Sequence, residues 1–284
     1  MPINPSSQQI QAKLKVAIVH DELIRRGGAE VVLEELLKIY PQADVFALYA
    51  GNVPKMTVDG KTYDIKTSSL QKMPLWFRMH PGRLLPFLPQ AAEQFDLSSY
   101  DVVISSASGF AKGVVTRSGV PHICYCHTPT RYLWDGYQNV LKNRKGNNIV
   151  LRLLFHYLRM VDFTAAQRPD AYIANSKYTA SRIKTYYRKE SSVVYPPIDT
   201  DFYTPLRSAF AGATGGAAPG FFLCVGRLTR EKRFDHAIQV AEKLGLKLKI
   251  VGVGRDEARL KKIAGKHTEF LGAVSKEQLR DLYR

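Results

Sequence analysis

The chain has 284 residues, 45% of them apolar and 23% charged, which predicts a folded protein long enough for two domains with separate cores. No apolar stretch reaches the roughly 18 residues of a membrane-spanning helix, and the N-terminus lacks the features of a secretory signal, so we expect a cytoplasmic protein. Lysine and arginine number 41 against 25 acidic residues, a net charge of +16. This excess predicts an anionic partner and leaves open phosphate groups, an acidic membrane surface and nucleic acid.

The chain contains three cysteines, Cys124, Cys126 and Cys224. An odd and sparse set does not make a disulfide framework, which fits a reducing compartment. Cys124 and Cys126 flank a single residue of an apolar run, so we expect both on one face of a strand. A metal site would need further ligands, and only His127 is near. We therefore interpret Cys124 and Cys126 as small buried side chains in a strand and predict no metal site.

A strand, a glycine turn and a helix open the chain. Residues 14–20 form a short apolar run. Beyond the turn, the residues with the spacing of one helix face are Ala29, Val32, Leu33 and Leu36. This order is typical of a doubly wound α/β domain. Further strands are predicted at 45–50, 101–108, 122–126 and 171–176, and their continuous apolar character favours a parallel sheet buried on both faces.

Two segments of the first half have a different character. Residues 70–101 are broken by prolines, aromatic and basic, which predicts irregular helices packed on the core. The alternative is a surface that contacts lipid headgroups through Trp76, Phe77, Arg78 and Arg83. Residues 149–168 predict a long helix with scattered arginines, whose apolar side we expect to be buried rather than bound to a membrane.

A segment rich in glycine and alanine, residues 207–220, has no apolar period and predicts a linker. We therefore place a first domain at residues 1–205 and a second at 206–284. The second domain begins a new α/β series, with strands at 221–226, 247–254 and 268–271. Helices are expected around 234–241 and 256–264, and Ser275 with Gln278 predicts a capping box at the start of a last helix.

The second domain is expected to be incomplete, because it contains only a small sheet and ends in a helix that has barely begun. Both halves are of the α/β class. A cleft between two such domains is the expected binding place.

Three groups of polar residues follow predicted strands. Gly27 and Gly28 would let the amides at a helix N-terminus approach a phosphate or a sugar hydroxyl. The alternative is a turn without function, and because the G-x-G-x-x-G pattern is missing, no nicotinamide cofactor is predicted. Arg227 and Lys232 could place two cations around a diphosphate, or form a solvated basic turn.

The third group is the segment CYCHTPTRYLW, residues 124–134, where His127 directly follows a strand. The carboxyl edge of such a sheet is where ligands bind. Arg131 adds a cation, and Tyr132 and Trp134 offer flat faces suited to a sugar ring. We interpret this loop as a polar wall of an active site.

Together, these motifs resemble the retaining glycosyltransferases of family 4, also called group 1, which have the GT-B fold of two facing Rossmann-like domains with parallel sheets. The resemblance covers essentially the whole chain. It rests on GGAE after the first strand, YCHTPTRYLW, ANSKYTASRI, VVYPPIDTDFYTP, VGRLTREKR and IVGVG, in this order. The sub-pattern H-T-P-x-R-Y-x-W is similar to that of bacterial transferases that build surface polysaccharides, often mannosyltransferases.

The resemblance implies a role for each matching residue. Gly27 and Gly28 match the glycine loop near the donor diphosphate, and Arg227 and Lys232 match the basic pair that binds it. His127 matches the histidine beside the transferred sugar. The remaining matches are Gly252 and Gly254 on the donor side, and Asn175 and Ser176 along the cleft.

The resemblance also implies a donor, GDP-mannose or a UDP-hexose, and no bound metal or other cofactor. One departure is that the family's acidic motif, two glutamates seven residues apart, is not found in this chain. The sequence therefore leaves open a fragment, a split gene product or a truncated form.

We hypothesise that the protein moves a hexose, with mannose favoured, to a saccharide or lipid-linked acceptor with retention, in polysaccharide biosynthesis. The basic surplus would then attract it to anionic lipids at the inner membrane face. The alternative is an inactive remnant that binds but does not catalyse. Nucleic-acid binding is disfavoured because the basic residues are dispersed and no such motif is present.

Overall fold

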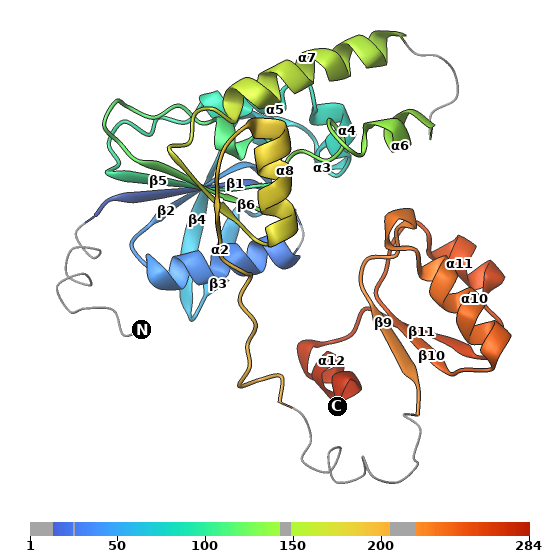
Figure 1. Cartoon of the computed structure of the whole chain (residues 1–284). Helices are drawn as coiled ribbons and strands as arrows, with labels where there is room; N and C mark the ends of the chain where they lie inside the picture. Colours follow the sequence, from blue (N-terminus) through green and yellow to red (C-terminus); the bar gives the residue numbers. More distant parts are fainter. Residues whose placement is uncertain (1–13, 25, 143–148, 205–219) are drawn as a thin grey trace. The chain divides into compact units, whose positions relative to one another are not determined.

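The computed structural model describes residues 14–24, 26–142, 149–204 and 220–284. They form two compact units, Met1–Pro197 and Ile198–Arg284, which we describe separately (Figure 1). The predicted domain boundary, after residue 205, lies a few residues further along the chain. Residues 198–204 belong with the second unit because they contact its last helix: Arg284 Nη2 donates to Thr204 Oγ1 at 2.9 Å, and Lys276 pairs with Asp199 at 3.2 Å. Most of the predicted linker lies outside the described residues.

The described strands of the first unit form one sheet in the order β3-β4-β2-β1-β5-β6-β7-β8, parallel except for the pair β3 and β4. Their bounds are β1 Val16–Leu23, β2 Asp44–Ala50, β3 Lys55–Val58, β4 Lys61–Thr67, β5 Val102–Ala107, β6 His122–Cys126, β7 Ala171–Ala174 and β8 Ser192–Val193. The chain winds outward from β1 in one direction and then returns to β5 and winds in the other. This doubly wound order creates a topological switch point between β1 and β5.

Helices cover both faces of this sheet, as the continuous apolar strands predict. Their bounds are α2 Gly28–Ile39, η1 Ser69–Lys72, α3 Leu75–Arg78, α4 Pro81–Leu84, α5 Leu88–Glu93, η2 Ala111–Gly113, α6 Tyr137–Lys142, α7 Ile149–Ala165 and α8 Lys177–Tyr187. Along β1, Val16 and Ile18 pack with α2, whereas Ala17 and Val19 belong to the core shared with α5, α7 and α8 (Figure 1). Alternating side chains of the strand therefore enter two separate cores.

The buried cysteines are confirmed, since Cys124 and Cys126 are reduced and lie in the same core. The antiparallel pair β3 and β4 was not predicted. Its strands are mostly polar and lie at the edge of the sheet, and Asp59 (φ 48°) and Gly60 (φ 80°) form the left-handed turn that joins them.

The predicted irregular helices of residues 70–101 are confirmed as η1, α3, α4 and α5, which bury Leu84 and Leu88. The alternative role of Arg78 at a lipid surface is wrong. Its side chain is buried, and its guanidinium donates to the backbone carbonyls of Met73 (2.9 Å), Gly51 (3.0 Å) and Ala50. The carbonyls at the end of β2 need a donor once they are buried, and Arg78 supplies it.

The predicted long helix is α7, and its apolar inner side is buried as expected, at Leu151, Phe155 and Leu158. No helix within the described ranges is long and apolar enough to cross a membrane.

The second unit contains a small parallel sheet in the order β11-β10-β9. Its elements are β9 Phe222–Val225, η3 Arg230–Lys232, α10 Phe234–Leu244, β10 Leu248–Val251, α11 Glu257–Ile263, β11 Thr268–Gly272 and α12 Lys276–Tyr283. The core includes Phe234, Ile238, Ile250 and Leu260. The predicted capping box is confirmed: Ser275 Oγ accepts from the amide of Gln278 at 3.1 Å, and the amide of Ser275 donates to Gln278 Oε1 at 2.9 Å.

Candidate active site

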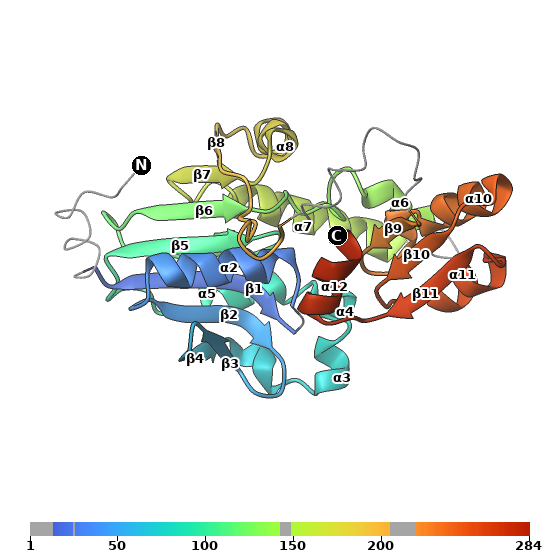
Figure 2. The ribbon, with the colours of Figure 1, turned by 90° about the horizontal axis from the view of Figure 1, so that it is seen from below.

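Polar side chains gather where β1, β5 and β6 end, next to the switch point of the first unit. The three strands run side by side with their carboxyl ends at one edge (Figure 2). His20 of β1 is in register with Ser106 of β5, and His127 directly follows β6, with its amide donating to the carbonyl of Ala107 at 2.9 Å. This edge is the part of a doubly wound sheet that binds ligands.

A chain of polar contacts joins these strands. Ser106 Oγ lies 3.0 Å from Nδ1 of His20 and 2.8 Å from Nε2 of His127. His20 Nε2 lies 3.7 Å from Oε1 of Glu30, and the other oxygen of Glu30 accepts from the amide of Gly27 at 2.8 Å. The chain therefore connects the predicted glycine loop to the predicted histidine.

The charge states along this chain are set by burial and by the neighbours. Burial, and then the nearby His20, lower the pKa of His127 to about 4, so His127 is neutral at pH 7. Burial opposes the ionised form of Glu30. Its contacts with His20 and with backbone amides outweigh that effect and hold the pKa of Glu30 below its usual value.

The glycine loop forms the start of α2. Gly27 is the N-cap residue, and Gly28 is the first residue of the helix. A Cβ atom on Gly28 would meet no atom within 4 Å, and one on Gly27 would lie 3.1 Å from Glu30 Oε2. The first amides of this helix are a positive end with open space beside it, which suits an anion.

Asp21, next to His20, fixes the loop that follows β5. Its carboxylate accepts from the backbone amides of Ser108 (2.6 Å), Gly109 (2.7 Å) and Ala111 (2.8 Å). Charge-assisted bonds of this kind are strong, so the two neighbouring strand ends are held together as one rigid edge.

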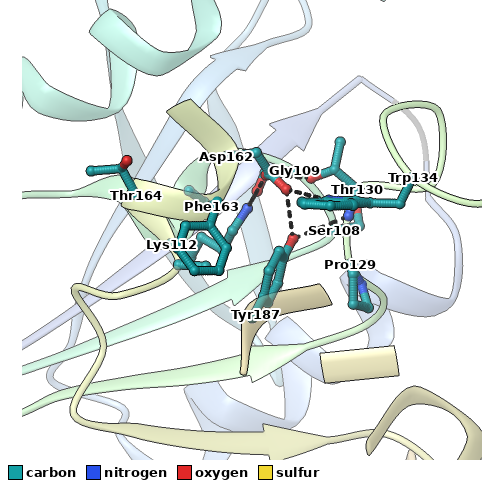
Figure 3. A network of polar contacts seen from close by, with 12 residues as sticks. Ser108, Gly109, Lys112, Pro129, Thr130, Trp134, Asp162, Phe163, Thr164 and Tyr187 are labelled. Atoms are coloured by element: carbon teal, nitrogen blue, oxygen red, sulfur yellow. Dashed lines mark hydrogen bonds and ion pairs between the residues drawn. The ribbon is translucent and has the colours of Figure 1, made fainter. Parts of the chain in front are cut away.

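The loop after His127 is held in place by a buried carboxylate, that of Asp162 in α7 (Figure 3). Asp162 accepts hydrogen bonds from Lys112 Nζ (2.6 Å), Thr130 Oγ1 (2.7 Å), Trp134 Nε1 (2.7 Å) and Tyr187 OH (3.1 Å). Asp162 and Thr130 have no exposed surface, and that of Lys112 is 1%. Although burial opposes the charged form of Lys112, the attraction of Asp162 raises its pKa.

A second clamp on the same loop comes from α8. Arg182 pairs with Asp135 at 2.8 Å, and its guanidinium donates to Thr128 Oγ1 and to the carbonyl of Pro129. Thr179 Oγ1 donates to the carbonyl of His127 at 3.4 Å. The loop that carries His127 is therefore held in place on two sides.

The structure gives the predicted residues of this loop different surroundings. Arg131 is exposed. Tyr132 is half-buried against the core, and burial raises its pKa. One face of the Trp134 ring stacks on Tyr186 at 5.0 Å between centroids, and its nitrogen is bound to Asp162. The surface that Trp134 could offer to a sugar is correspondingly reduced.

Asn175 and Ser176 follow β7 at the same edge of the sheet. Ser176 is the N-cap of α8 and accepts from the amide of Thr179 at 3.1 Å, while its hydroxyl lies 3.2 Å from Asn175 Oδ1. Both side chains are half-buried. Helix capping accounts for Ser176 locally, and the predicted role along a cleft stays a prediction.

The two predicted cations of the second unit lie at the carboxyl end of β9. Arg227 lies two residues after the strand, and Lys232 is the last residue of η3, two residues before the start of α10. Both are exposed, and neither makes an ion pair with any described residue. Unpaired cations beside a helix N-terminus can bind a diphosphate.

Gly252 and Gly254, in the loop after β10, are required by close packing. A Cβ atom on Gly252 would lie 2.0 Å from the carbonyl oxygen of Gly226, and one on Gly254 would lie 2.2 Å from that of Leu228. Because neither glycine has a side chain, the loop after β9, in which Arg227 lies between Gly226 and Leu228, can pack directly against this loop.

Replacing Gly254 with Ala is expected to destabilise the second unit by about 1–3 kcal/mol, because backbone atoms must move to admit the methyl group. Thermal unfolding followed by circular dichroism measures this effect. Gly28→Ala is the matched control, because its methyl group meets open space. Equal melting temperatures of the two variants would show that the packing is looser than described.

Sequence reasoning missed several residues of the site. His20, Ser106, Glu30 and Asp162 were not singled out, although His20 and Ser106 are polar residues at the ends of apolar strands, which is a usable signal. Within the described ranges, no group of three or more His, Cys, Asp or Glu side chains could hold a metal ion.

The fold is that of the GT-B glycosyltransferases. The chain is similar in structure to sucrose-phosphate synthase of Thermosynechococcus elongatus, with a TM-score of 0.59 and 14% identity over 95% of this chain and 73% of that one. It is also similar to HepE of Anabaena, solved in complex with UDP-glucose, with a TM-score of 0.55 and 17% identity over 94% and 71% of the two chains.

Sequence comparison identifies the family. The sequence profile of Glycosyltransferase Family 4 matches residues 26–202, and that of Glycosyl transferases group 1 matches residues 216–284. Since the first match alone covers more than half of the chain, the protein belongs to glycosyltransferase family 4.

A curated relative is the alpha-1,3/1,6-mannosyltransferase ALG2 of Candida glabrata, 31% identical over 125 residues. The matching part is 42% of this chain and 25% of that protein, so the chain spans about a quarter of its relative's length.

Proposed function

We propose that the protein transfers a hexose, with retention, from a nucleotide diphosphate sugar to a saccharide or lipid-linked acceptor in polysaccharide biosynthesis. The observation that carries the proposal is a pair of exposed cations, Arg227 and Lys232, at the end of β9 near a helix N-terminus, which make no ion pair with the residues that the structure describes. When the glycosidic bond breaks, negative charge develops on the leaving diphosphate. Fixed cations stabilise that charge without a metal ion.

The first unit, considered by itself, carries further residues for which we propose roles. His127, neutral and held by two clamps, would contact the transferred sugar, and the start of α2 at Gly27 and Gly28 would approach the phosphates. Arg131, with its exposed guanidinium, and the pair Asn175 and Ser176 would meet the acceptor.

For the donor we propose GDP-mannose or a UDP-hexose. The likeness to a mannosyltransferase supports mannose, and the UDP-glucose complex of HepE supports a uridine donor.

A panel of radiolabelled GDP- and UDP-hexoses tests the proposal. Incubation with saccharide and lipid-linked acceptors is expected to release the nucleoside diphosphate and to form an α-linked product from an α-linked donor. An inverted product would contradict retention. Binding of the donor without release of nucleotide would favour the alternative of an inactive binding protein.

We also propose peripheral contact with an anionic membrane, and the outer face of α7 supports it. The apolar side chains there are exposed over several turns: Ile149, Val150, Leu153, Tyr157 and Met160 are all more than half exposed. Arg152 is exposed beside them, and Lys142, Arg144 and Lys145 precede the helix in the sequence. An apolar helix face with basic neighbours is typical of helices that lie in the membrane interface.

Leu153→Glu is expected to weaken binding to phosphatidylglycerol vesicles by about tenfold or more, because about 2 kcal/mol of apolar burial is lost and a carboxylate is repelled. Vesicle cosedimentation measures the effect. Val240→Glu on α10 is the matched control, because Val240 is an exposed apolar residue of the second unit. The membrane proposal fails if both variants bind the vesicles as strongly as the original protein, or if the original protein does not bind acidic vesicles.

A further inference from the structure

The contacts among Glu30, His20, Ser106 and His127 do more than pack the edge of the sheet. Ser106 has no exposed surface and His20 is 2% exposed, so the centre of this hydrogen-bonded series of side chains is shielded from water. Each central polar atom must therefore satisfy its neighbour. This requirement determines where the hydrogens can lie.

The single hydrogen of the Ser106 hydroxyl determines which group donates and which accepts along this series. The hydroxyl can donate to only one of the two ring nitrogens beside it, so the other ring must donate to the serine oxygen. In a first setting, Nε2–H of His127 donates to Ser106, Ser106 donates to Nδ1 of His20, and Nε2–H of His20 faces Glu30. Nδ1 of His127 then carries no hydrogen.

A second setting contains one more proton. A proton enters at Nδ1 of His127, and the proton on Nε2 passes to Ser106 Oγ. The former hydroxyl proton then moves to Nδ1 of His20. His127 is again neutral but has become the other tautomer. The positive charge lies on His20, whose Nε2 is 3.7 Å from the carboxylate of Glu30.

We propose that Glu30, His20 and Ser106 are positioning residues that form a proton relay with His127, in which the charge on His20 decides which nitrogen of His127 carries hydrogen. Nδ1 of His127 makes no hydrogen bond with the described residues, so it is the atom that meets a ligand. It offers an acceptor in the first setting and a donor in the second. That the ligand is a sugar hydroxyl rests on the proposed function, whereas the relay itself does not.

The surroundings make the relay measurable. The titratable groups facing the two rings in the described part of the chain are Glu30 of α2, Asp21 and Glu22 of β1, and Tyr125 of β6. Because burial and His20 lower the pKa of His127 to about 4, its ring is neutral between about pH 5 and pH 8. A spectral change of His127 in that window is therefore a change of tautomer.

Nitrogen-15 NMR of the full chain labelled at histidine tests the relay without any ligand. As the pH falls from about 8 to about 5, His127 is expected to convert from the Nε2–H to the Nδ1–H tautomer while its own ring stays neutral. Ser106→Ala, which removes the hydroxyl that joins the two rings, is expected to abolish the conversion.

Ser105→Ala is the matched control. Ser105 is equally buried on the same strand and lies 2.9 Å from Nε2 of a different histidine, His122. Its replacement is expected to disturb His122 and to leave the conversion of His127 intact. His20→Asn, which keeps a polar side chain beside Ser106 but has no second ring nitrogen to pass a proton on, is expected to fix His127 in one tautomer.

Three results would overturn the relay: a single tautomer of His127 across the window in the original protein, conversion that persists in Ser106→Ala, or double protonation of His127 itself in that window. The NMR readout needs no donor or acceptor. If the unsubstituted protein transferred no sugar, that result would therefore count against the proposed function and not against the relay.

Discussion

Replacing Asp162 with Ala is expected to destabilise the first unit by about 3–5 kcal/mol, because it leaves the ammonium group of Lys112 buried without its counter-ion. Thr130, Trp134 and Tyr187 lose their acceptor at the same time, so the loop after His127 loses its anchor. Both tryptophans of the chain, Trp76 and Trp134, lie in the first unit. Urea unfolding followed by tryptophan fluorescence therefore reports on that unit.

Asp64→Ala is the control, because the side chain of Asp64 is 84% exposed and its ion pair with Lys55 is on the surface. A surface pair contributes about 0–1 kcal/mol, so a small change is expected. Lys112→Met combined with Asp162→Leu should cost less than the sum of the two single changes, since no buried charge is left unpaired. Additive costs, or an Asp162→Ala variant as stable as Asp64→Ala, would contradict the account of this network.

Lys232→Ala is expected to reduce sugar transfer by about 10²–10³-fold, the usual cost of removing a group that stabilises charge in the transition state. Folding should be unaffected because Lys232 is exposed and makes no ion pair with the described residues. Turnover is measured as release of nucleoside diphosphate from the donor that the panel identifies.

Lys243→Ala is the matched control, because Lys243 is an exposed lysine in the last turn of α10, the helix that follows Lys232. Its loss should leave turnover unchanged. If Lys232→Ala transfers sugar as fast as Lys243→Ala, Lys232 has no part in leaving-group stabilisation.

The fold could be predicted wherever burial on both faces leaves a continuous apolar run in the sequence. β1, β2, β5, β6 and β7 are such strands, and each was predicted to within a few residues. β3 and β4 were missed because their mostly polar residues lie at the sheet edge, where one face needs no apolar side chains.

The location of His127 at the end of β6 followed from the sequence, because a polar residue directly after a buried parallel strand must lie at the carboxyl edge. Its hydrogen-bonded neighbours could not be predicted from the sequence. Ser106 is 21 residues away from His127, and His20 is 86 residues away from Ser106. Only the order of the strands brings them together.

Buried charges were the least predictable feature. Asp162 and Lys112 are 50 residues apart, and Asp162 occupies one position of a helix whose pattern indicates only an apolar inner face. Arg78 was assigned to a surface alternative because an arginine is rarely buried unless it is paired. Arg78 is paired with the backbone carbonyls of Ala50, Gly51 and Met73, and because every residue has a carbonyl, this pairing could not be predicted from the sequence.

Equilibrium binding of nucleotides tests the central claim, that Arg227 and Lys232 hold a diphosphate, most directly. By titration calorimetry, UDP or GDP is expected to bind the chain at least about tenfold more tightly than the matching monophosphate, since the second phosphate gains charge-assisted bonds. The preference should disappear in the Arg227→Ala, Lys232→Ala double variant. Equal affinity for mono- and diphosphates in the original protein, or a preference that survives the double change, would contradict it.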